Sequence, residues 1–449
     1  MRNIFLLVFS GLLLAGCSSK QWQETSSGIE VNLRGVRGKD PLKLKIDVID
    51  DNIIHVMASP ETRFSKRKSL IVADNRDLSI GGFRVGGDSD SITVSTARLN
   101  VKVSIETGAV VFYDKDYNTI LKEYGTGGKS FKPFSVEGSD GYSLYQVFES
   151  PEDEAFYGLG QHQSDEFNYK GLNEELFQYN TKVSIPFIVS NKNYGILWDN
   201  YSLTKFGDPR DYSQIDLFRL YDENGEEGGL TASYLVDSDP GKVFVKRKES
   251  CIDYENLETI RNFPADFPFN GSTVTWSGMI EPVESGLYHF KLYYAGYIKV
   301  FIDDEAVVAE RWRTAWNPNT FRFRKEMEGD KKYSIRVEWK PDGGVSYLGL
   351  KAQSPRAPED QGNLSLWSEM GDRIDYYFIK GDNLDEVISG YRSVTGKAPI
   401  MPKWALGYWQ SRERYRSQAQ LLDVVKEYRK RNIPLDNIVL DWSYWPVDS

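Results

Sequence analysis

Two stretches decide the fold of the last part of this chain: Trp404-Ala-Leu-Gly-Tyr-Trp-Gln410 and Ile438-Val-Leu-Asp-Trp-Ser-Tyr-Trp445. Each contains an apolar run, Ala405–Trp409 and Ile438–Leu440, with the length of a buried strand. The roughly thirty residues that join the runs suffice for the crossover of a βαβ unit, which is almost always right-handed. The pattern therefore predicts two parallel strands joined by a helix, the opening of a β/α barrel or a doubly wound domain.

The segment between these runs carries the signals of one amphipathic helix. Ser417 with Gln420 three residues later is a capping box, which satisfies backbone N–H groups at a helix start. Basic residues gather towards the end of the segment, where the helix dipole favours cations. Pro434 predicts the end of the helix. The apolar positions at helical spacing are Leu421, Leu422, Val424, Val425 and Tyr428.

Asp441 follows the second predicted strand directly, at the end where a β/α barrel places its chemistry. A carboxylate at a strand end also caps a following turn, so position alone leaves both interpretations open. A closed eight-stranded barrel takes about 250 residues. We therefore expect the chain to be the front part of a longer protein, ending after the second barrel strand.

The N-terminus has the pattern of a targeting segment. Arg2 gives a basic start, and the apolar run Ile4–Leu14 is too short to span a membrane. Leu14-Ala-Gly-Cys17 then resembles a bacterial lipobox, which implies cleavage before Cys17 and lipid attachment to its sulfur. We expect residues 1–17 to be a lipoprotein signal peptide with its lipobox, and residues 18–27 a tether. The alternative is an ordinary secretory signal; the membrane face stays open.

Composition limits the possible functions. A net charge of −10 and a pI near 5.2 argue against nucleic-acid binding, which needs a basic surface. With Cys17 assigned to lipid, Cys251 has no partner within the chain and is expected to be an inert small apolar residue. The histidines, His55, His162 and His289, lack the spacing of metal ligands, so we predict no metal and no cofactor.

Most of the remaining chain predicts antiparallel β-structure. Residues 28–238 alternate apolar and polar positions between Gly, Asn and Asp turns, the pattern of a β-sandwich. A second all-β module is expected at 239–355, where Asp303-Asp304 is interpreted as a hairpin turn rather than a calcium pair. Residues 356–398 return to the sandwich and end in a linker helix, and 399–449 form the first barrel unit.

Several motifs, taken together, resemble glycoside hydrolase family 31. They are Phe156-Tyr-Gly-Leu-Gly160, Ile185-Pro-Phe187, Tyr194-Gly-Ile-Leu-Trp198, Tyr391-Arg-Ser-Val-Thr-Gly396, Pro402-Lys-Trp-Ala-Leu-Gly407 and Ile438–Trp445. The second module resembles the domain first described in anthrax protective antigen, through Trp276-Ser-Gly-Met-Ile280, Ser285-Gly-Leu-Tyr288 and Val300-Phe-Ile-Asp303. The combination is similar to bacterial lipoprotein α-xylosidases that act on xyloglucan. It implies a galactose-mutarotase-like sandwich, an inserted protective-antigen-like β-sandwich and the start of a (β/α)8 barrel.

The resemblance also implies a retaining mechanism, in which one carboxylate attacks the anomeric carbon and another protonates the leaving oxygen. In the family both come from later barrel strands, so neither is expected in this chain, and the fragment alone is expected to be inactive. Asp441 matches the family aspartate that binds hydroxyls of the sugar in the −1 subsite. Trp442 would wall the same pocket. Asn180 lies where the family's sandwich loop reaches over the barrel mouth. Local structural roles remain open for Trp442 and Asn180.

Two other functions remain open at this stage. One is an α-glucosidase fragment, because contacts to shared hydroxyls do not separate xylose from glucose. The other is a lipid-anchored glycan-binding protein without catalysis, which would use the inserted module and the sandwich face. In every case the expected partners are an oligosaccharide and, through Cys17, a membrane.

Overall fold

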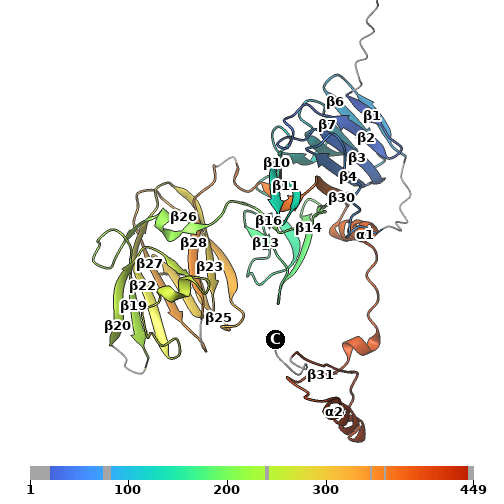
Figure 1. The fold of residues 1–449 in the computed structure, drawn as a ribbon. Coiled ribbons are helices and arrows are strands. Elements are labelled where there is room, and N and C mark those ends of the chain that lie inside the picture. The colour runs from blue at the N-terminus through green and yellow to red at the C-terminus, as the bar shows by residue number, and fades with distance from the viewer. Residues whose placement is uncertain (1–20, 74–81, 238–241, 344–345, 358–359, 443–449) are drawn as a thin grey trace, which may run out of the picture. The chain divides into compact units, whose positions relative to one another are not determined.

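The computed structural model describes residues 21–73, 82–237, 242–343, 346–357 and 360–442. Cys17 lies outside the described residues, so the predicted lipobox remains a prediction. Contacts divide the chain into two compact units. The first extends to Tyr391 and contains the β-domains (Figure 1). The second begins at Arg392 and takes in the short segment that starts at Val72.

The predicted antiparallel sandwich is confirmed. One sheet has eight strands, in the order β1 (Trp22–Glu24), β2 (Gly28–Asn32), β3 (Lys43–Asp50), β4 (Ile53–Ser59), β30 (Ile374–Lys380), β15 (Tyr194–Trp198), β14 (Val183–Ser190) and β12 (Phe156–Gln161). The facing sheet has ten strands: β13 (Glu174–Leu176), β16 (Thr204–Phe206), β29 (Leu364–Gly371), β11 (Ser139–Glu149), β9 (Thr119–Glu123), β8 (Val110–Asp114), β7 (Leu99–Ser104), β6 (Ser91–Ser95) and β5 (Arg84–Gly87), with β10 (Lys129–Val136) paired to β11. Alternating apolar side chains from both sheets form one core.

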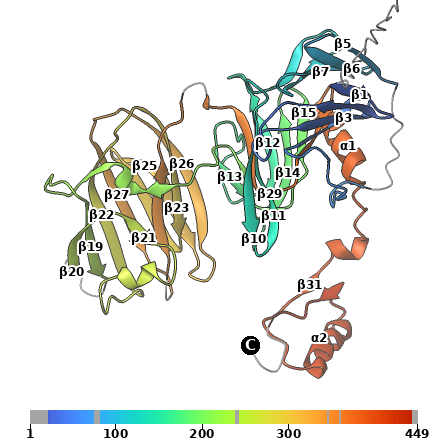
Figure 2. The same ribbon diagram turned by 45° about the horizontal axis from the view of Figure 1, so that its top comes forward.

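The two strands that follow the insert occupy inner positions in the sandwich. β30 lies between β4 and β15, and β29 lies between β16 and β11. Figure 2 labels β29 next to β11. The inner face of β30 is almost wholly buried, with Tyr376 and Phe378 at 0% exposure. The sandwich is therefore complete only when the chain has returned from the insert.

A buried ion pair lies inside the sandwich. The Glu123 carboxylate contacts the Lys129 ammonium, and the two side chains are 0% and 1% exposed. Glu123 also accepts hydrogen bonds from the Val110 N–H at 2.7 Å and from the Tyr376 hydroxyl at 2.8 Å. Burial raises the pKa of Glu123 and lowers that of Lys129, while their mutual attraction opposes both shifts.

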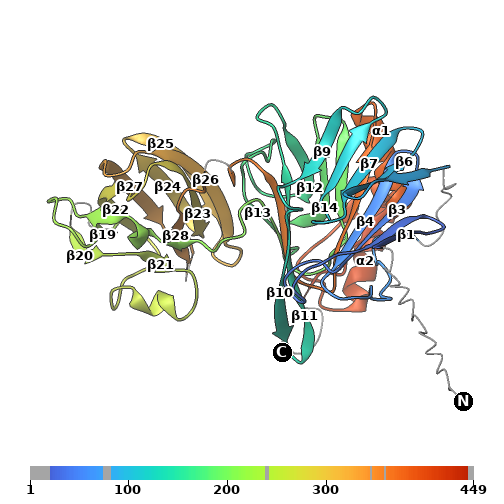
Figure 3. The same cartoon turned by 90° about the horizontal axis from the view of Figure 1, so that it is seen from above.

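The second module is also a β-sandwich. One sheet has the order β17 (Ser213–Gln214), β28 (Leu348–Gln353), β23 (Gly286–Tyr294) and β26 (Asn319–Met327), with β21 (Ile252–Tyr254) paired to β28. The other has β20 (Val243–Glu249), β19 (Leu230–Val236), β22 (Ser272–Glu281), β27 (Tyr333–Lys340), β24 (Gly296–Ile302) and β25 (Glu305–Arg313), with β18 (Arg219–Tyr221) paired to β22. The 3-10 turns η1 (Ile215–Leu217) and η2 (Thr259–Asn262) complete the module, whose strands Figure 3 labels.

The strand pairing moves the start of this module upstream of the expected residue 239. β17, β18 and β19, which cover parts of 213–236, pair with strands of the insert and with none of the first sandwich. Alternation alone misplaced the boundary because it assigns a strand to a sheet face but does not identify its neighbour. The predicted turn at Asp303-Asp304 is confirmed: both residues have positive φ, +50° and +60°, as a tight hairpin between β24 and β25 requires.

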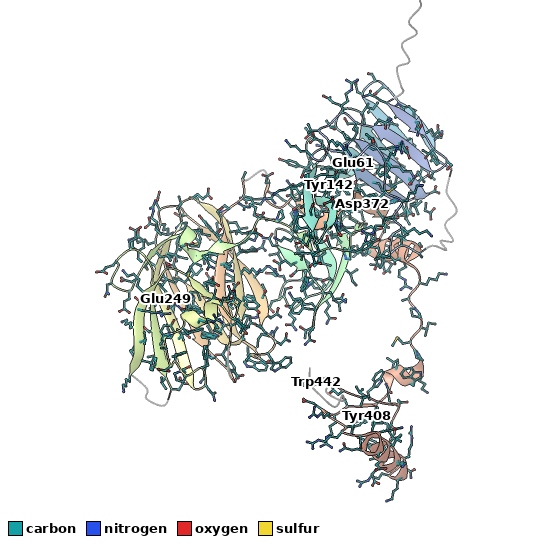
Figure 4. The ribbon with its side chains drawn as sticks, in the orientation of Figure 1. Glu61, Tyr142, Glu249, Asp372, Tyr408 and Trp442 are labelled. Carbon is teal, nitrogen blue, oxygen red and sulfur yellow. The ribbon has the colours of Figure 1, made fainter. Side chains whose placement is uncertain are left out.

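A single carboxylate organises the aromatic core of the insert. Glu249 accepts hydrogen bonds from Tyr234 at 2.6 Å, Tyr254 at 2.9 Å and the Trp276 indole at 2.7 Å (Figure 4). Arg247 adds a charged contact at 2.6 Å. Each carboxylate oxygen thus has two partners, which makes this buried charge acceptable.

Charged side chains join the insert to the first sandwich. Arg322 on β26 donates to Glu174 at 2.9 Å and lies 3.4 Å from Glu175, although its side chain is only 13% exposed. Arg311 on β25 pairs with Asp165, which lies in the long loop that follows β12. That loop, between β12 and β13, is therefore held against the insert by an ion pair.

We expect His289 to make stability depend on pH. Burial lowers its pKa from 6.5 to about 4, and the nearby Arg324 cation acts in the same direction. The unfolded chain binds a proton at this site below about pH 6.5 while the folded chain does not, so stability is complete above that pH and falls towards pH 4. At pH 5 the loss should be about 2 kcal/mol.

Denaturant unfolding of wild type and His289→Gln at pH 7 and pH 5 measures this loss. The glutamine variant should lose about 2 kcal/mol less stability between the two pH values than the wild type. Equal losses in the two proteins would rule out His289 as the source.

The second unit contains the predicted strand–helix–strand order in a reduced form. α1 (Leu384–Thr395), whose start is capped by the Asn383 side chain at 3.0 Å, leads into it. The 3-10 turn η4 (Lys403–Leu406), β31 (Trp409–Gln410), α2 (Gln418–Lys430) and β32 (Asn437–Ile438) follow. β31 and β32 are parallel, as expected for a βαβ unit.

Two details of this unit differ from expectation. Ala405–Trp409 is not a buried strand. Its first two residues end the η4 turn, only Trp409 lies in a strand, and Leu406 is 80% exposed. The Asp436 side chain accepts a hydrogen bond from the Tyr408 N–H at 3.1 Å. Likewise, Pro434 does not end α2. The helix ends earlier in a Schellman motif, where Asn432 has φ +55° and the Ile433 N–H donates to the Tyr428 carbonyl at 3.0 Å.

Candidate functional site

The two parallel strands of the second unit determine the position of Asp441. Trp409 pairs with Asn437 and Gln410 with Ile438, and the Val439 N–H extends the pairing to the Gln410 carbonyl at 2.9 Å. The chain leaves this short sheet directly afterwards. Asp441 therefore follows the C-terminal end of the second strand, as predicted.

Within the part of the chain that the structure describes, the Asp441 carboxylate accepts one local hydrogen bond. Its Oδ1 accepts from the Trp442 N–H at 2.8 Å, the turn-capping contact that position alone had left open. A carboxylate has two oxygens and about four acceptor positions, so this contact leaves acceptor capacity for ligand hydroxyls. Capping and sugar binding are therefore compatible roles for this side chain.

Trp442 presents an exposed ring next to Asp441. The side chain is 59% exposed, and it lies with Tyr408 at the strand end of the second unit (Figure 4). An indole in this position offers a flat apolar face with a polar edge. The wall role expected for Trp442 remains a prediction.

Gln410, which was not among the site residues predicted from the sequence, forms a hydrogen-bonded cluster with three tyrosines at the end of β31. Gln410 Oε1 accepts from the Tyr408 hydroxyl at 2.7 Å and from the Tyr428 hydroxyl, and its Nε2 donates to the Tyr415 hydroxyl at 3.3 Å. The hydrogen bond with Tyr408 raises the pKa of Tyr428. The cluster fixes the first strand end next to the second, with Tyr415 only 3% exposed.

Asn180 belongs to the first unit and is exposed in a turn just before β14. The next residue, Thr181, has φ +72°, which marks a tight local turn. Tyr179, on the other side, donates its hydroxyl to Asn319 of the insert at 3.2 Å. The loop that carries Asn180 is thus attached to the inserted module, and the asparagine is available at its tip.

Among the residues that the structure describes, no group of three or more His, Cys, Asp or Glu side chains is arranged to hold a metal ion. Cys251 is a free, half-buried thiol whose pKa is raised by burial. What the two strand ends offer is a carboxylate beside aromatic rings, a combination suited to hydroxyl-rich ligands.

Three family models match the chain in the order of its domains. Residues 43–206 match the glycosyl hydrolase 31 N-terminal galactose mutarotase-like domain, and residues 227–361 match the PA14 domain. Residues 398–448 match the glycosyl hydrolases family 31 TIM-barrel domain. The chain therefore carries the N-terminal domain and the start of the TIM-barrel domain of glycosyl hydrolase family 31. The predicted resemblance, including the protective-antigen-like insert, is confirmed.

Individual family members agree with this assignment. The crystal structure of a family 31 α-xylosidase from Xanthomonas citri is 39% identical and superposes with a TM-score of 0.84 over 94% of this chain and 46% of that one. An α-xylosidase from Saccharolobus solfataricus is 28% identical over 414 residues, 90% of this chain and 35% of its own length. An α-glucosidase from Bacillus thermoamyloliquefaciens is 40% identical over 78 residues, 17% of this chain and 10% of its own length. This chain thus spans less than half the length of these relatives.

Proposed function

We propose that this chain forms the N-terminal part of a retaining α-glycoside hydrolase, an α-xylosidase that acts on xyloglucan oligosaccharides. The observation that carries the proposal is the similarity to the Xanthomonas citri α-xylosidase, which extends over 94% of the chain at 39% identity. That span includes both β-domains and the barrel start. The retaining mechanism requires two carboxylates about 5–5.5 Å apart, and we assign these to further barrel strands.

In this proposal the described strand ends bind the sugar rather than break the bond. Asp441 accepts hydrogen bonds from hydroxyls in the −1 subsite, where a charged acceptor holds them more tightly than a neutral one. Trp442 contributes a ring to the pocket wall. The sugar-binding role predicted for Asn180 rests on the family resemblance alone. The exposure of Asn180 and Trp442 is what these roles need.

Hydrolysis of chromogenic substrates by the full-length protein tests the proposal. We expect turnover of an aryl α-xyloside, and release of xylose from xyloglucan oligosaccharides with the anomeric configuration retained. Residues 1–449 alone should show no turnover. A full-length protein that cleaves neither aryl α-xylosides nor xyloglucan side chains would contradict the assignment.

An α-glucosidase is the second candidate, and one observation favours it. The Bacillus thermoamyloliquefaciens α-glucosidase is 40% identical to this chain over 78 residues. Xylose lacks the hydroxymethyl group that glucose carries at C5, so the residues that face this carbon decide between them. A kcat/KM higher for aryl α-glucoside than for aryl α-xyloside would select this candidate.

We also propose that the mature protein is exported and held to a membrane by lipid on Cys17. The support is the sequence Leu14-Ala-Gly-Cys17 after a short apolar run. Among the described residues, no helix is long and apolar enough to cross a bilayer. A lipid anchor would then provide the attachment.

Replacing Cys17 by serine should remove this anchor. Without the thiol no lipid can be attached, so we expect the Cys17→Ser protein to lose radiolabelled palmitate and to leave the membrane fraction. Cys251→Ser is the matched control, because that thiol lies within the folded insert. Equal palmitate labelling of wild type and Cys17→Ser would disprove the anchor.

A further inference from the structure

One end of the eight-stranded sheet brings together the start of the described chain and two further segments. Trp22 of β1 pairs with Val31 of β2, and Asn32, the last residue of β2, pairs with Lys43 at the start of β3. Lys43 also pairs with Ser59, the last residue of β4. The start of β1 and the segments that follow β2 and β4 therefore lie at the same end of this sheet, whose first four strands Figure 1 shows side by side.

The two segments at this end are basic. Residues 33–42 join β2 to β3 and carry three cations and one carboxylate, and residues 60–70 follow β4 and carry four cations and one carboxylate. We name the two segments together the basic end. Seven cations and two carboxylates give it a formal charge of +5, in a chain whose net charge is −10. Its cations, all exposed, are Arg34, Arg37, Lys39, Arg63, Lys66, Arg67 and Lys68.

Both carboxylates of the basic end have partners within the protein. Glu61 pairs with Arg37 at 2.7 Å and accepts a hydrogen bond from the Tyr142 hydroxyl, and Figure 4 labels Glu61 beside Tyr142. Asp40 accepts a hydrogen bond from the Val36 N–H at 2.9 Å. The charge that remains for an external partner is therefore positive. It includes three cations that form no ion pair with the described residues: Arg34, Arg63 and Lys66.

Acidic side chains adjoin another part of the basic end. Arg67 and Lys68 line a cavity that Asp140 and Asp372 also line. Opposite charges at close range reduce the field that these two cations exert at a distance. We therefore expect the three cations without ion pairs to contribute most to the attraction of an anionic partner.

The backbone of residues 60–70 is held against the sheet. Arg373, in the turn between β29 and β30, donates to the carbonyls of Ser65 and Arg67 at 3.3 Å each. The Leu70 N–H donates to the Tyr201 hydroxyl at 2.6 Å. A segment that is already fixed by its backbone loses less entropy when its side chains bind a partner.

Each segment of the basic end also exposes an apolar side chain. Val36 is 61% exposed and Leu70 is 77% exposed. Cations beside exposed apolar groups are typical of proteins that lie on a membrane surface. The cations are attracted to anionic headgroups, and the apolar side chains enter the boundary between headgroups and acyl chains.

We propose that the basic end binds the surface of a bilayer that contains anionic phospholipids. The start of the chain fits this orientation, because Cys17 precedes Trp22 by five residues, which span at most about 18 Å. A lipid on Cys17, the anchor proposed above, would bring this end of the sheet to the membrane. A lipid chain combined with a basic patch attaches a protein more firmly than either signal alone. The electrostatic contact itself depends neither on the anchor nor on the proposed hydrolase activity.

Co-sedimentation with phospholipid vesicles tests the basic end. The protein is the full-length chain that begins at Ser18, which lacks the lipid-bearing cysteine and keeps every described residue. We expect it to sediment with vesicles of phosphatidylcholine containing about one third phosphatidylglycerol, and not with vesicles of phosphatidylcholine alone. About 1 M NaCl should release it, because charges more than about 3 Å apart are then screened.

A triple variant measures the contribution of the cations. Arg34→Gln, Arg63→Gln and Lys66→Gln together should lower the partition coefficient on the anionic vesicles about 100-fold, since each cation near such a surface contributes about fivefold. Replacing the same residues by the other cation, Arg34→Lys, Arg63→Lys and Lys66→Arg, should retain binding, because the charge is unchanged.

The matched control makes the same change of charge on α2. Its side chains are 74%, 79% and 66% exposed, and the substitutions are Lys426→Gln, Lys430→Gln and Arg431→Gln. This variant should bind the anionic vesicles like the wild type. Circular dichroism should be the same for all three variants and the wild type, which separates loss of binding from loss of folding.

Three outcomes overturn the proposal. The first is a wild type that does not sediment with the anionic vesicles. The second is a folded triple variant of the basic end that binds as strongly as the α2 control. The third is release of the protein by inorganic phosphate at unchanged ionic strength, which would indicate a site for a small anion instead of a membrane surface. Hydrolysis of aryl α-xylosides enters none of these measurements, so failure here is distinct from failure of the proposed function.

Discussion

Asp441→Asn in the full-length protein should lower kcat/KM for an aryl α-xyloside about 100-fold, and Asp441→Ala should lower it further. A hydrogen bond to a charged acceptor contributes about 1.5–3 kcal/mol, and bonds to sugar hydroxyls strengthen as the oxocarbenium-like transition state forms. Because part of that interaction exists only in the transition state, kcat should fall together with kcat/KM. Steady-state kinetics with both variants measures the effect.

The alternative role of Asp441 makes a different prediction. If the carboxylate only caps the turn through its 2.8 Å contact with the Trp442 N–H, its loss should lower thermal stability and leave kcat unchanged. Asp423→Asn is the matched control, since that carboxylate lies on α2, is 72% exposed and pairs only with Lys426 at 3.4 Å. A kcat for Asp441→Asn within twofold of the control would show that Asp441 caps the turn and does not bind the sugar.

The sequence predicted the parts of this fold in which one residue pattern has one physical meaning. Alternating apolar positions such as Leu44, Ile46 and Val48 gave the sandwich strands, because only one face of each strand can be buried. Ser417 and Gln420 predicted the start of α2 correctly. In the structure the serine hydroxyl accepts a hydrogen bond from the Gln420 N–H at 3.2 Å. The Gln420 side chain accepts a hydrogen bond at 2.7 Å from the N–H of Arg416, the residue before the Ser417 cap.

The parts that were missed depend on partners distant in sequence. The start of the insert was misplaced because Leu230–Val236 alternates like any other strand, and only its pairing with β22 assigns it to the second module. The run Ala405–Trp409 is apolar enough for a strand, but the Tyr408 N–H donates a hydrogen bond to the Asp436 side chain instead of to a neighbouring strand. Local patterns contain neither interaction.

The candidate site was predictable in position and less so in composition. Asp441 followed from strand length and from the rule that barrel chemistry lies at strand ends. The Gln410 cluster did not, because Tyr415 and Tyr428 come from a loop and a helix that approach β31 only after folding. An amide at the end of a strand, with tyrosines on the following helix, was the available signal.

Lys129→Met should destabilise the first sandwich by about 3–5 kcal/mol, the largest stability change that we expect from a single substitution. The ammonium lies beside Glu123 and also donates to the Gly108 carbonyl at 3.2 Å. Without it, the Glu123 charge would stay buried with only the Val110 N–H and the Tyr376 hydroxyl as partners. Denaturant unfolding followed by circular dichroism measures the loss.

The matched control is Lys122→Met, which breaks a neighbouring ion pair on the surface. Lys122 and Glu149 are 2.7 Å apart and are 44% and 41% exposed, so their pair should contribute at most about 1 kcal/mol. Adding Glu123→Gln to Lys129→Met should recover part of the lost stability. The second substitution removes the buried Glu123 charge, which the first leaves without its cationic partner. If Lys129→Met cost no more than Lys122→Met, the buried ammonium would not be what holds Glu123 in the core. The position of β30 in the sandwich would then be stabilised by the packing of Tyr376 and Phe378 alone.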